Sequence, residues 1–171
     1  MSLLNTPQAP RNEVINPMSS GLFRTIPLAA VILGFAVTAF YYGQLPAKIP
    51  IHFGVGGKAD SFGPKLILWL IPAINLALFY GLEAATKTSY KWFNYPVTIT
   101  EENTTRQHNI ALQLIAVTRL VVCLMISFIV YSIVKTALAG EAQINMLIMG
   151  LFLIALFGSI GYFTWRAKSS S

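Results

Sequence analysis

The sequence predicts an all-α membrane protein: a four-helix transmembrane bundle with an extended Pro/Gly-rich extracytoplasmic cap between helices 1 and 2. Two observations predict this fold class. First, 55% of the 171 residues are hydrophobic and only 11% are charged, whereas soluble domains carry a charge on about a quarter of their residues. Second, the charged residues leave four long windows, each suited to a helix that crosses the ~30 Å hydrocarbon core in about 20 residues. A soluble core in so short a chain could not bury all four.

Each window defines one expected span. The first and fourth windows hold 23 and 24 consecutive uncharged residues, the second holds 17, and the third is interrupted only by Arg119. The predicted spans are about 25–44, 65–83, 110–135 and 143–165, joined by an outer loop 45–64 and an inner loop 84–109. Residues 1–23 are predicted to be a flexible cytoplasmic tail, and residues 24–171 a single membrane domain.

The positions of Lys and Arg predict the orientation in the cell membrane. The N-terminal tail, the loop 84–109 and the C-terminal tail lie on one side of four spans and hold seven basic residues: Arg11, Arg24, Lys87, Lys91, Arg106, Arg166 and Lys168. The opposite side holds four: Lys48, Lys58, Lys65 and Lys135. Since basic residues concentrate on the cytoplasmic side, both termini are expected in the cytoplasm. An alternative reads the first span as a signal peptide cleaved after Ala39.

The outer loop combines extended and turn-forming segments. Residues 48–53, "KIPIHF", alternate apolar side chains with Pro50 and His52, which predicts a short extended segment. The glycines at 54, 56 and 57 allow a tight reversal, and "DSFGPK" at 60–65 is interpreted as a turn that feeds a helix. His52 and Asp60 either form hydrogen bonds within the cap or recognise a partner. No metal site is predicted, because one His and one Asp are too few ligands.

Arg119 is expected to lie within the membrane, about 13 Å from the start of the third span. An arginine at that depth is costly unless it meets water or acceptors. Asn75 in the second span lies at a similar depth, so a contact between Arg119 and Asn75 is predicted, with Gln113 and Glu83 as further partners. This intramembrane pair is interpreted either as a link between helices or as part of a polar functional cavity.

Two stretches resemble a known family. "LPAKIPIHFGVGGKADSFGPK" (45–65) and "FNYPVTITEENTTRQHNIALQL" (93–114) resemble the sequence blocks of the SdpI-like immunity and signalling membrane proteins, whose N-terminal half is a bacterial membrane domain of unknown function. The resemblance covers roughly residues 25–135. The matching outer residues are Pro46, Pro50, His52, Phe53, Gly57, Asp60, Gly63 and Lys65, and the matching inner residues are Pro96, Glu102 and Asn103. It implies toxin immunity or signal reception and attaches no catalytic role to any residue.

These observations favour a non-enzymatic membrane protein that binds a peptide or protein through His52, Phe53, Asp60 and Lys65 in the outer loop. Two alternatives stay open, an accessory subunit of a larger or self-associated membrane complex and a small transporter component. No catalytic residues are predicted, because no nucleophile-and-base group or phosphate-binding loop occurs. No cofactor or metal is predicted, since the single Cys123 lies in an apolar run. The partners are the lipid bilayer and other proteins; nucleic acid is excluded, because basic residues stand singly at the edges of apolar runs.

Overall fold

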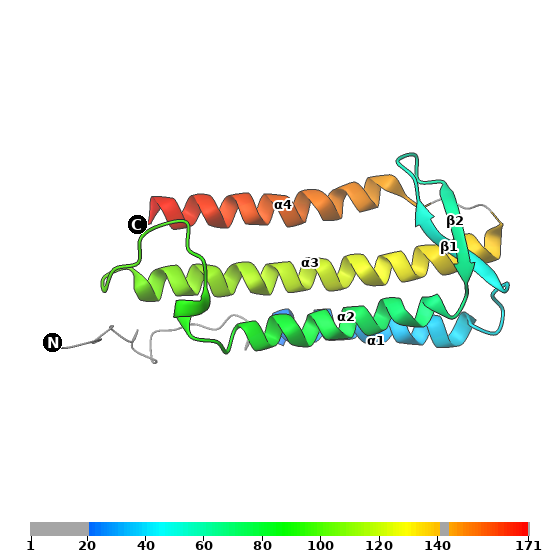
Figure 1. The fold of residues 1–171 in the computed structure, drawn as a ribbon, viewed down its shortest axis with the longest axis horizontal. Helices are drawn as coiled ribbons and strands as arrows, with labels where there is room; N and C mark the ends of the chain where they lie inside the picture. The colour runs from blue at the N-terminus through cyan, green and yellow to red at the C-terminus, as the bar shows by residue number, and fades with distance from the viewer. Residues whose placement is uncertain (1–20, 141–143, 171) are drawn as a thin grey trace.

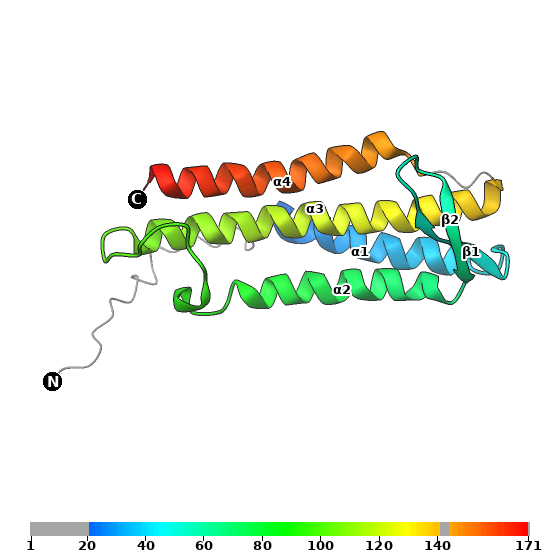
Figure 2. The ribbon, with the colours of Figure 1, turned by 45° about the horizontal axis from the view of Figure 1, so that its top comes forward.

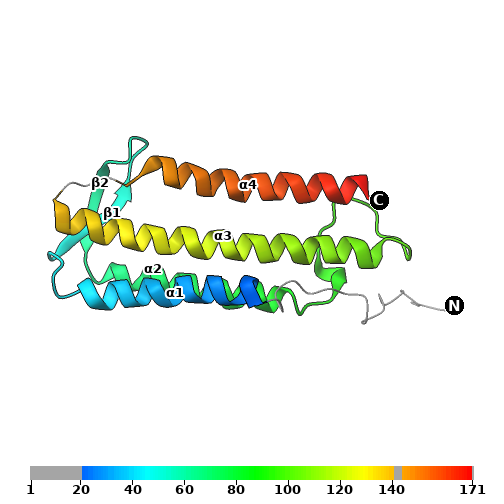
Figure 3. The same ribbon diagram turned by 180° about the vertical axis from the view of Figure 1, so that it is seen from behind.

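The computed structural model describes residues 21–140 and 144–170. In chain order its elements are α1 (Gly21–Tyr41), β1 (Lys48–Phe53), β2 (Ala59–Pro64), α2 (Ile67–Ala85), the short 3-10 helix η3 (Tyr90–Trp92), α3 (Thr104–Ala139) and α4 (Met146–Ser169). The four long helices lie side by side (Figure 1). The strands lie at one end of the bundle, here called the hairpin end. Residues 86–103 and the end of α4 lie at the other, the loop end (Figure 3). Most of the tail expected to be flexible, residues 1–20, lies outside the described residues.

All four long helices are long and apolar enough to cross a membrane. Helix α3 is central, and α1, α2, α4 and β1 all pack against it (Figure 2). Its 36 residues extend over ~54 Å at 1.5 Å per residue, well beyond the ~30 Å hydrocarbon core. Both ends of α3 therefore have room to carry structure outside the lipid, the hairpin at one end and the 86–103 segment at the other.

The fold is not all-α, because the segment between the first two helices is an antiparallel β-hairpin. The prediction of an extended segment over 48–53 agrees with β1. The interpretation of the following residues as a turn was wrong, since Ala59–Pro64 pairs with β1 as β2. Gly57, with φ +77°, lies in the turn between them, a conformation that costs glycine little. Few residues of β2 are apolar, so only pairing with β1 makes this segment a strand.

The expected period of two in β1 is broken by a bulge. Pro50 pairs with Phe62 and His52 pairs with Ser61, so Ile51 is the extra residue on its strand. The bulge moves Ile51 to a surface where it is 41% exposed, while Ile49 is fully buried. The hairpin thus presents apolar side chains on two different surfaces.

Three apolar clusters hold the bundle together along its length. The cluster at the hairpin end joins the hairpin to the helices and comprises Leu45, Ile49, Leu68, Val130, Ile133 and Val134. The middle cluster comprises Ala30, Val31, Phe79 and Cys123 from α1, α2 and α3. The cluster at the loop end comprises Ile110, Phe163 and Ala167 and joins α3 to α4. Helix α4 keeps most of its apolar side chains exposed, as expected for a helix that faces lipid.

Candidate functional site

Arg119 is fully buried at the interface of α1, α2 and α3. Its Nη2 donates a 2.5 Å hydrogen bond to the carbonyl oxygen of Phe23, and its Nη1 lies 3.7 Å from Glu83 Oε2. The guanidinium also lies over the ring of Phe79, 4.8 Å from the ring centre. Its Nε and Nη1 have no hydrogen-bond partner among the described residues. Arg119 is therefore bound to two other helices but is not fully satisfied.

Both contacts of Arg119 lie toward the loop end of the bundle. Side chains on a helix lean toward its N-terminus, and the N-terminus of α3 is at the loop end. The arginine therefore reaches back to Glu83 near the end of α2 and to Phe23 near the start of α1. Glu83 also pairs with Lys87 at 3.5 Å, which extends the charged group to the end of the bundle.

Asn75 belongs to a second polar group, closer to the hairpin end. Its Nδ2 donates to the carbonyl oxygen of Cys123 at 3.1 Å and to Ser127 Oγ at 3.2 Å. The Ser127 hydroxyl lies 2.7 Å from the carbonyl oxygen of Ala30, so this group also joins α1, α2 and α3. None of these bonds links Asn75 to Arg119. The two predicted partners thus lie in the same interface but bind different groups.

His52 and Asp60 contact each other on the surface of the hairpin. His52 Nδ1 lies 2.5 Å from Asp60 Oδ1, and the two side chains are 68% and 53% exposed. Each residue stands beside a register irregularity in the pairing of β1 with β2, which brings the two side chains together across the strands. Both side chains are accessible from solvent, so they can form hydrogen bonds with a partner without a movement of the backbone.

Phe53 and Lys65, the other two predicted binding residues, point into the protein. Phe53 packs against the apolar cluster at the hairpin end. Lys65 Nζ donates to the carbonyl oxygens of Tyr42 and Leu45 at 3.0 and 3.1 Å, and lies over the Tyr42 ring. These carbonyls follow the end of α1, where a positive charge is favourable. The structure therefore assigns Lys65 a role in attaching the hairpin to α1.

The motif residues at the loop end are spread over the segment before α3. Asn103 is 6% exposed; its Oδ1 accepts from the Thr100 backbone N–H and its Nδ2 donates to the Thr98 carbonyl oxygen. Pro96 lines a cleft between this segment, α3 and α4, and Glu102 lines a neighbouring groove. Asn103 thus shapes the turn that leads into α3, while the other two residues face surface depressions.

Tyr95 was not among the predicted site residues, although it lies beside Pro96 and lines the same cleft. Its hydroxyl lies 3.2 Å from His108 Nδ1. Burial, with a smaller contribution from Tyr90, raises the pKa of the Tyr95 phenol to about 12. The phenol is therefore neutral at physiological pH and is held between the loop and α3.

Three further contacts were also missed: Ser127, the Phe23 carbonyl and Gln107. A polar side chain inside an apolar run is a usable signal for Ser127. Pro27 is the sequence feature that could have predicted a free Phe23 carbonyl, because proline has no N–H to donate to the carbonyl four residues earlier. Gln107 carries no such signal, since a glutamine near a helix end is usually exposed.

The four long apolar helices indicate a multi-pass membrane protein. Residues 29–76 match a family described as a "Domain of unknown function (DUF1648)". The matched region begins in α1, contains the whole hairpin and ends in α2 just after Asn75. Arg119 and the loop-end residues lie outside it. The match is narrower than the resemblance expected over residues 25–135.

One similar protein, from Archaeoglobus fulgidus, is described as "Uncharacterized protein". It is 40% identical over 47 residues, which is 28% of this chain and 26% of that protein. The aligned part of the chain therefore spans about a quarter of that relative's length. No solved structure matches.

Proposed function

We propose that the chain is a non-enzymatic receptor of the SdpI-like type, which binds a peptide or protein partner at its hairpin end in toxin immunity or signal reception. The observation that carries the proposal is the exposed His52–Asp60 pair, set among exposed apolar side chains on a hairpin attached to the bundle. Val55 is 97% exposed, Phe62 54% and Ile51 41%. Protein-binding surfaces combine apolar side chains with polar groups that form hydrogen bonds to the partner.

The attachment of the hairpin also supports binding. Ile49 is fully buried in the hairpin-end cluster, Lys65 bonds to the end of α1, and the Ile144 backbone N–H donates to the Gly57 carbonyl oxygen at 2.9 Å. Contacts to α1, α3 and the segment before α4 thus restrain the strands and the turn. A partner that binds a restrained surface loses less conformational entropy in ordering it.

The distribution of charge supports an extracytoplasmic hairpin end. Six basic residues of the described chain lie at the loop end or near it: Arg24, Lys87, Lys91, Arg106, Arg166 and Lys168. Four lie at the hairpin end: Lys48, Lys58, Lys65 and Lys135. Basic residues favour the cytoplasmic side, so the hairpin would meet partners that arrive from outside the cell.

Site-specific photo-crosslinking tests this proposal. A photoreactive amino acid replaces Val55 at the tip of the hairpin, and cells that make the full chain are irradiated. We expect a discrete adduct that is lost when Asp60→Lys or His52→Ala is added, because either change removes the exposed pair. Ser61→Ala is the matched control, since Ser61 is an exposed neighbour on the same strand.

The amount of protein in the membrane is measured for every variant. An adduct that persists at full yield in both pair variants would contradict the proposal. So would a loss of adduct that only follows a loss of protein, because the pair would then serve folding.

A second candidate, an accessory subunit of a larger complex, is favoured by the surface of α4. A side chain added at Gly150, Gly158 or Gly161 would meet no atom within 4 Å, so α4 presents small residues that allow another helix to approach closely. Purification in a mild detergent separates the candidates. A companion in fixed stoichiometry supports the subunit, and a lone chain that retains the hairpin adduct supports the receptor.

A further inference from the structure

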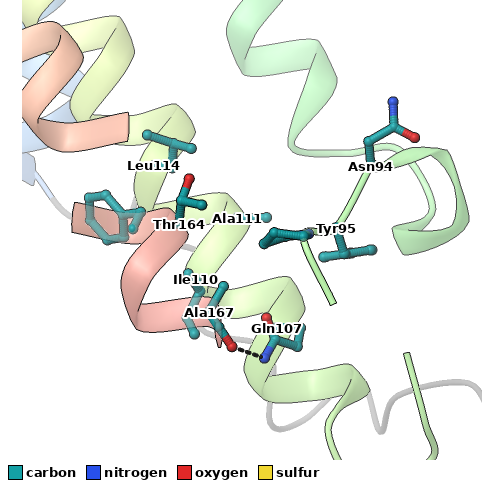
Figure 4. Close-up of a pocket in the computed structure, with 10 residues that line it drawn as sticks. Asn94, Tyr95, Gln107, Ile110, Ala111, Leu114, Thr164 and Ala167 are labelled. Carbon is teal, nitrogen blue, oxygen red and sulfur yellow. Dashed lines mark hydrogen bonds between the residues drawn. The ribbon is translucent and has the colours of Figure 1, made fainter. Parts of the chain in front are cut away.

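A cleft opens at the loop end of the bundle. It has a volume of about 350 Å³ and lies between the segment before α3, the start of α3 and the end of α4. Its lining residues are Asn94, Tyr95, Pro96, Gln107, Ile110, Ala111, Leu114, Phe163, Thr164 and Ala167. Figure 4 shows lining residues from the three segments, with Gln107, Ile110 and Leu114 on α3 beside Thr164 and Ala167 on α4.

Gln107 gives this cleft an unused hydrogen-bond acceptor. The residue is 1% exposed, and its Nε2 donates to the Ala167 carbonyl oxygen at 2.9 Å (Figure 4). Its Oε1 is buried and has no hydrogen-bond partner among the described residues. A buried acceptor without a donor is destabilising. The cleft therefore favours an occupant that brings an N–H or O–H group.

The lining of the cleft is mostly apolar, with a few polar side chains among the apolar ones. Gln107 lies in the part nearer the end of the bundle, and Leu114 lies seven residues further along α3, ~10 Å deeper at 1.5 Å per residue and beside Thr164 (Figure 4). Phe163 and Ile110 belong to the apolar cluster that joins α3 to α4. An occupant that matches this lining is largely apolar and carries a polar group that can reach Gln107.

Neighbouring aromatic residues place the cleft at the level of lipid headgroups. Tyr162 and Trp165 on α4 are 52% and 64% exposed and flank Phe163 and Thr164, which line the cleft. Exposed Tyr and Trp near the end of a membrane helix mark the boundary between hydrocarbon and water. The amphiphile that is abundant at this level is a membrane lipid.

Local charge favours an anionic lipid. Arg106 precedes Gln107 in the chain, and Arg166 and Lys168 stand on either side of Ala167. The nearest acidic residue along α3 and its approach is Glu102, which lines the adjacent groove together with Arg106 and Arg166. The adjacent groove, where Arg106 and Arg166 outnumber Glu102, therefore attracts a phosphate group.

We propose that this cleft binds an anionic glycerophospholipid whose headgroup carries free hydroxyls, as phosphatidylglycerol does, with Gln107 Oε1 accepting a hydrogen bond from one hydroxyl. The upper part of an acyl chain packs against Leu114 and Phe163. This site is independent of the hairpin and of any partner bound there.

Native mass spectrometry of the purified full chain tests the proposal with two anionic lipids that have the same acyl chains. Phosphatidylglycerol carries headgroup hydroxyls, and phosphatidylmethanol has the same charge without them. We expect the chain to bind phosphatidylglycerol about fivefold more tightly, the factor expected for one hydrogen bond. Equal binding of the two lipids would overturn the proposal and would leave a water molecule as the partner of Gln107.

Two variants assign the preference to the cleft. Gln107→Met removes the acceptor and is expected to abolish the fivefold preference. Gln113→Met is the matched control on the same helix, because Gln113 Oε1 already accepts from Arg166 Nη1 at 2.6 Å; the preference should persist. A preference that survives Gln107→Met would place the hydroxyl elsewhere and contradict the assignment.

A third variant covers the case in which Gln107→Met fails to fold. Leu114→Trp fills the apolar part of the cleft and keeps the Gln107–Ala167 hydrogen bond. It should therefore weaken the binding of both lipids to the same extent. Soluble glycerol phosphate, which has hydroxyls and charge but no acyl chain, should not displace phosphatidylglycerol. Unchanged lipid binding in Leu114→Trp, or displacement by glycerol phosphate, would overturn the proposed binding mode.

Discussion

Arg119 of α3 donates a hydrogen bond to the carbonyl oxygen of Phe23 in α1, the carbonyl that Pro27 leaves without its usual helix donor. In a regular helix the residue four positions later would donate to this oxygen, but proline has no N–H. In lipid an unpartnered carbonyl is costly. Arg119 thus supplies the hydrogen bond that Pro27 cannot donate to the Phe23 carbonyl, which gives the arginine a structural role in the bundle.

Loss of Glu83 is predicted to be more damaging than loss of Arg119. Glu83→Gln leaves a buried guanidinium without its carboxylate and should lower the free energy of unfolding by about 3 kcal/mol. This value is at the low end for breaking a buried ion pair, because the Glu83 side chain is 21% exposed. Arg119→Met removes the buried charge itself and should cost about 1 kcal/mol. Thermal unfolding in detergent measures both. The double variant should be more stable than Glu83→Gln alone, and equal or reversed costs for the single variants would contradict this account.

Pro27→Ala is predicted to uncouple Arg119 from α1. The substituted alanine would supply a backbone N–H to the Phe23 carbonyl, so the hydrogen bond from Arg119 would add less stability. Arg119→Met should therefore cost less in the Pro27→Ala background than in the native chain, by about 1 kcal/mol for one hydrogen bond. A double-mutant cycle in the same unfolding assay measures the difference. Additive costs would mean that the two residues act independently.

Ser127→Ala and Asn75→Leu are predicted to destabilise the bundle by about 1 kcal/mol each, the size of a hydrogen bond between membrane helices. Their combined cost should be less than the sum, because one bond joins the two side chains. Ser159→Ala serves as the control, since that hydroxyl bonds within its own helix to the Leu156 carbonyl oxygen. If Ser159→Ala destabilised the bundle as much as Ser127→Ala does, the result would contradict the claim that the Ser127 hydrogen bonds stabilise the bundle by joining helices.

Gly57→Ala is predicted to loosen the contact between the hairpin and the segment before α4. Gly57 has φ +77°, and an added Cβ would lie 2.7 Å from the Ile144 carbonyl oxygen. The left-handed conformation alone costs about 1–2 kcal/mol for a residue with a Cβ. Limited proteolysis should cut the variant faster near residue 57. Gly56→Ala is the control, because its Cβ would have no atom within 4 Å. It should resist proteolysis as well as the native chain does.

The helices were predictable because lipid imposes a simple demand on the chain. A spanning helix needs a long apolar run, so windows with at most one charged residue located all four helices that the structure shows to be long and apolar enough to cross a membrane. Strand β2 was not predictable in this way. Its polar residues are paired through their backbone with β1, and backbone pairing leaves little trace in side-chain composition.

The partners of Arg119 were only partly predictable, for a geometric reason. Counting residues gives a depth along the helix axis, and this count included Glu83 among the further partners. It does not give the direction in which a side chain leans. Because Arg119 leans toward the N-terminus of α3, it reaches Glu83, while Asn75 bonds to Cys123 and Ser127 nearer the hairpin end. Gln113 faces α4 and bonds to Arg166.

The central claim, that four helices cross the membrane with the hairpin outside and the loop end inside, is tested most directly by cysteine labelling in intact cells. The native Cys123 is fully buried and provides an unreactive background. A membrane-impermeant maleimide should label Val55→Cys in intact cells and Ser169→Cys only after the cells are permeabilised. Labelling of Ser169→Cys but not Val55→Cys in intact cells would contradict the orientation, and recovery of the chain in the aqueous fraction without detergent would contradict the membrane assignment itself.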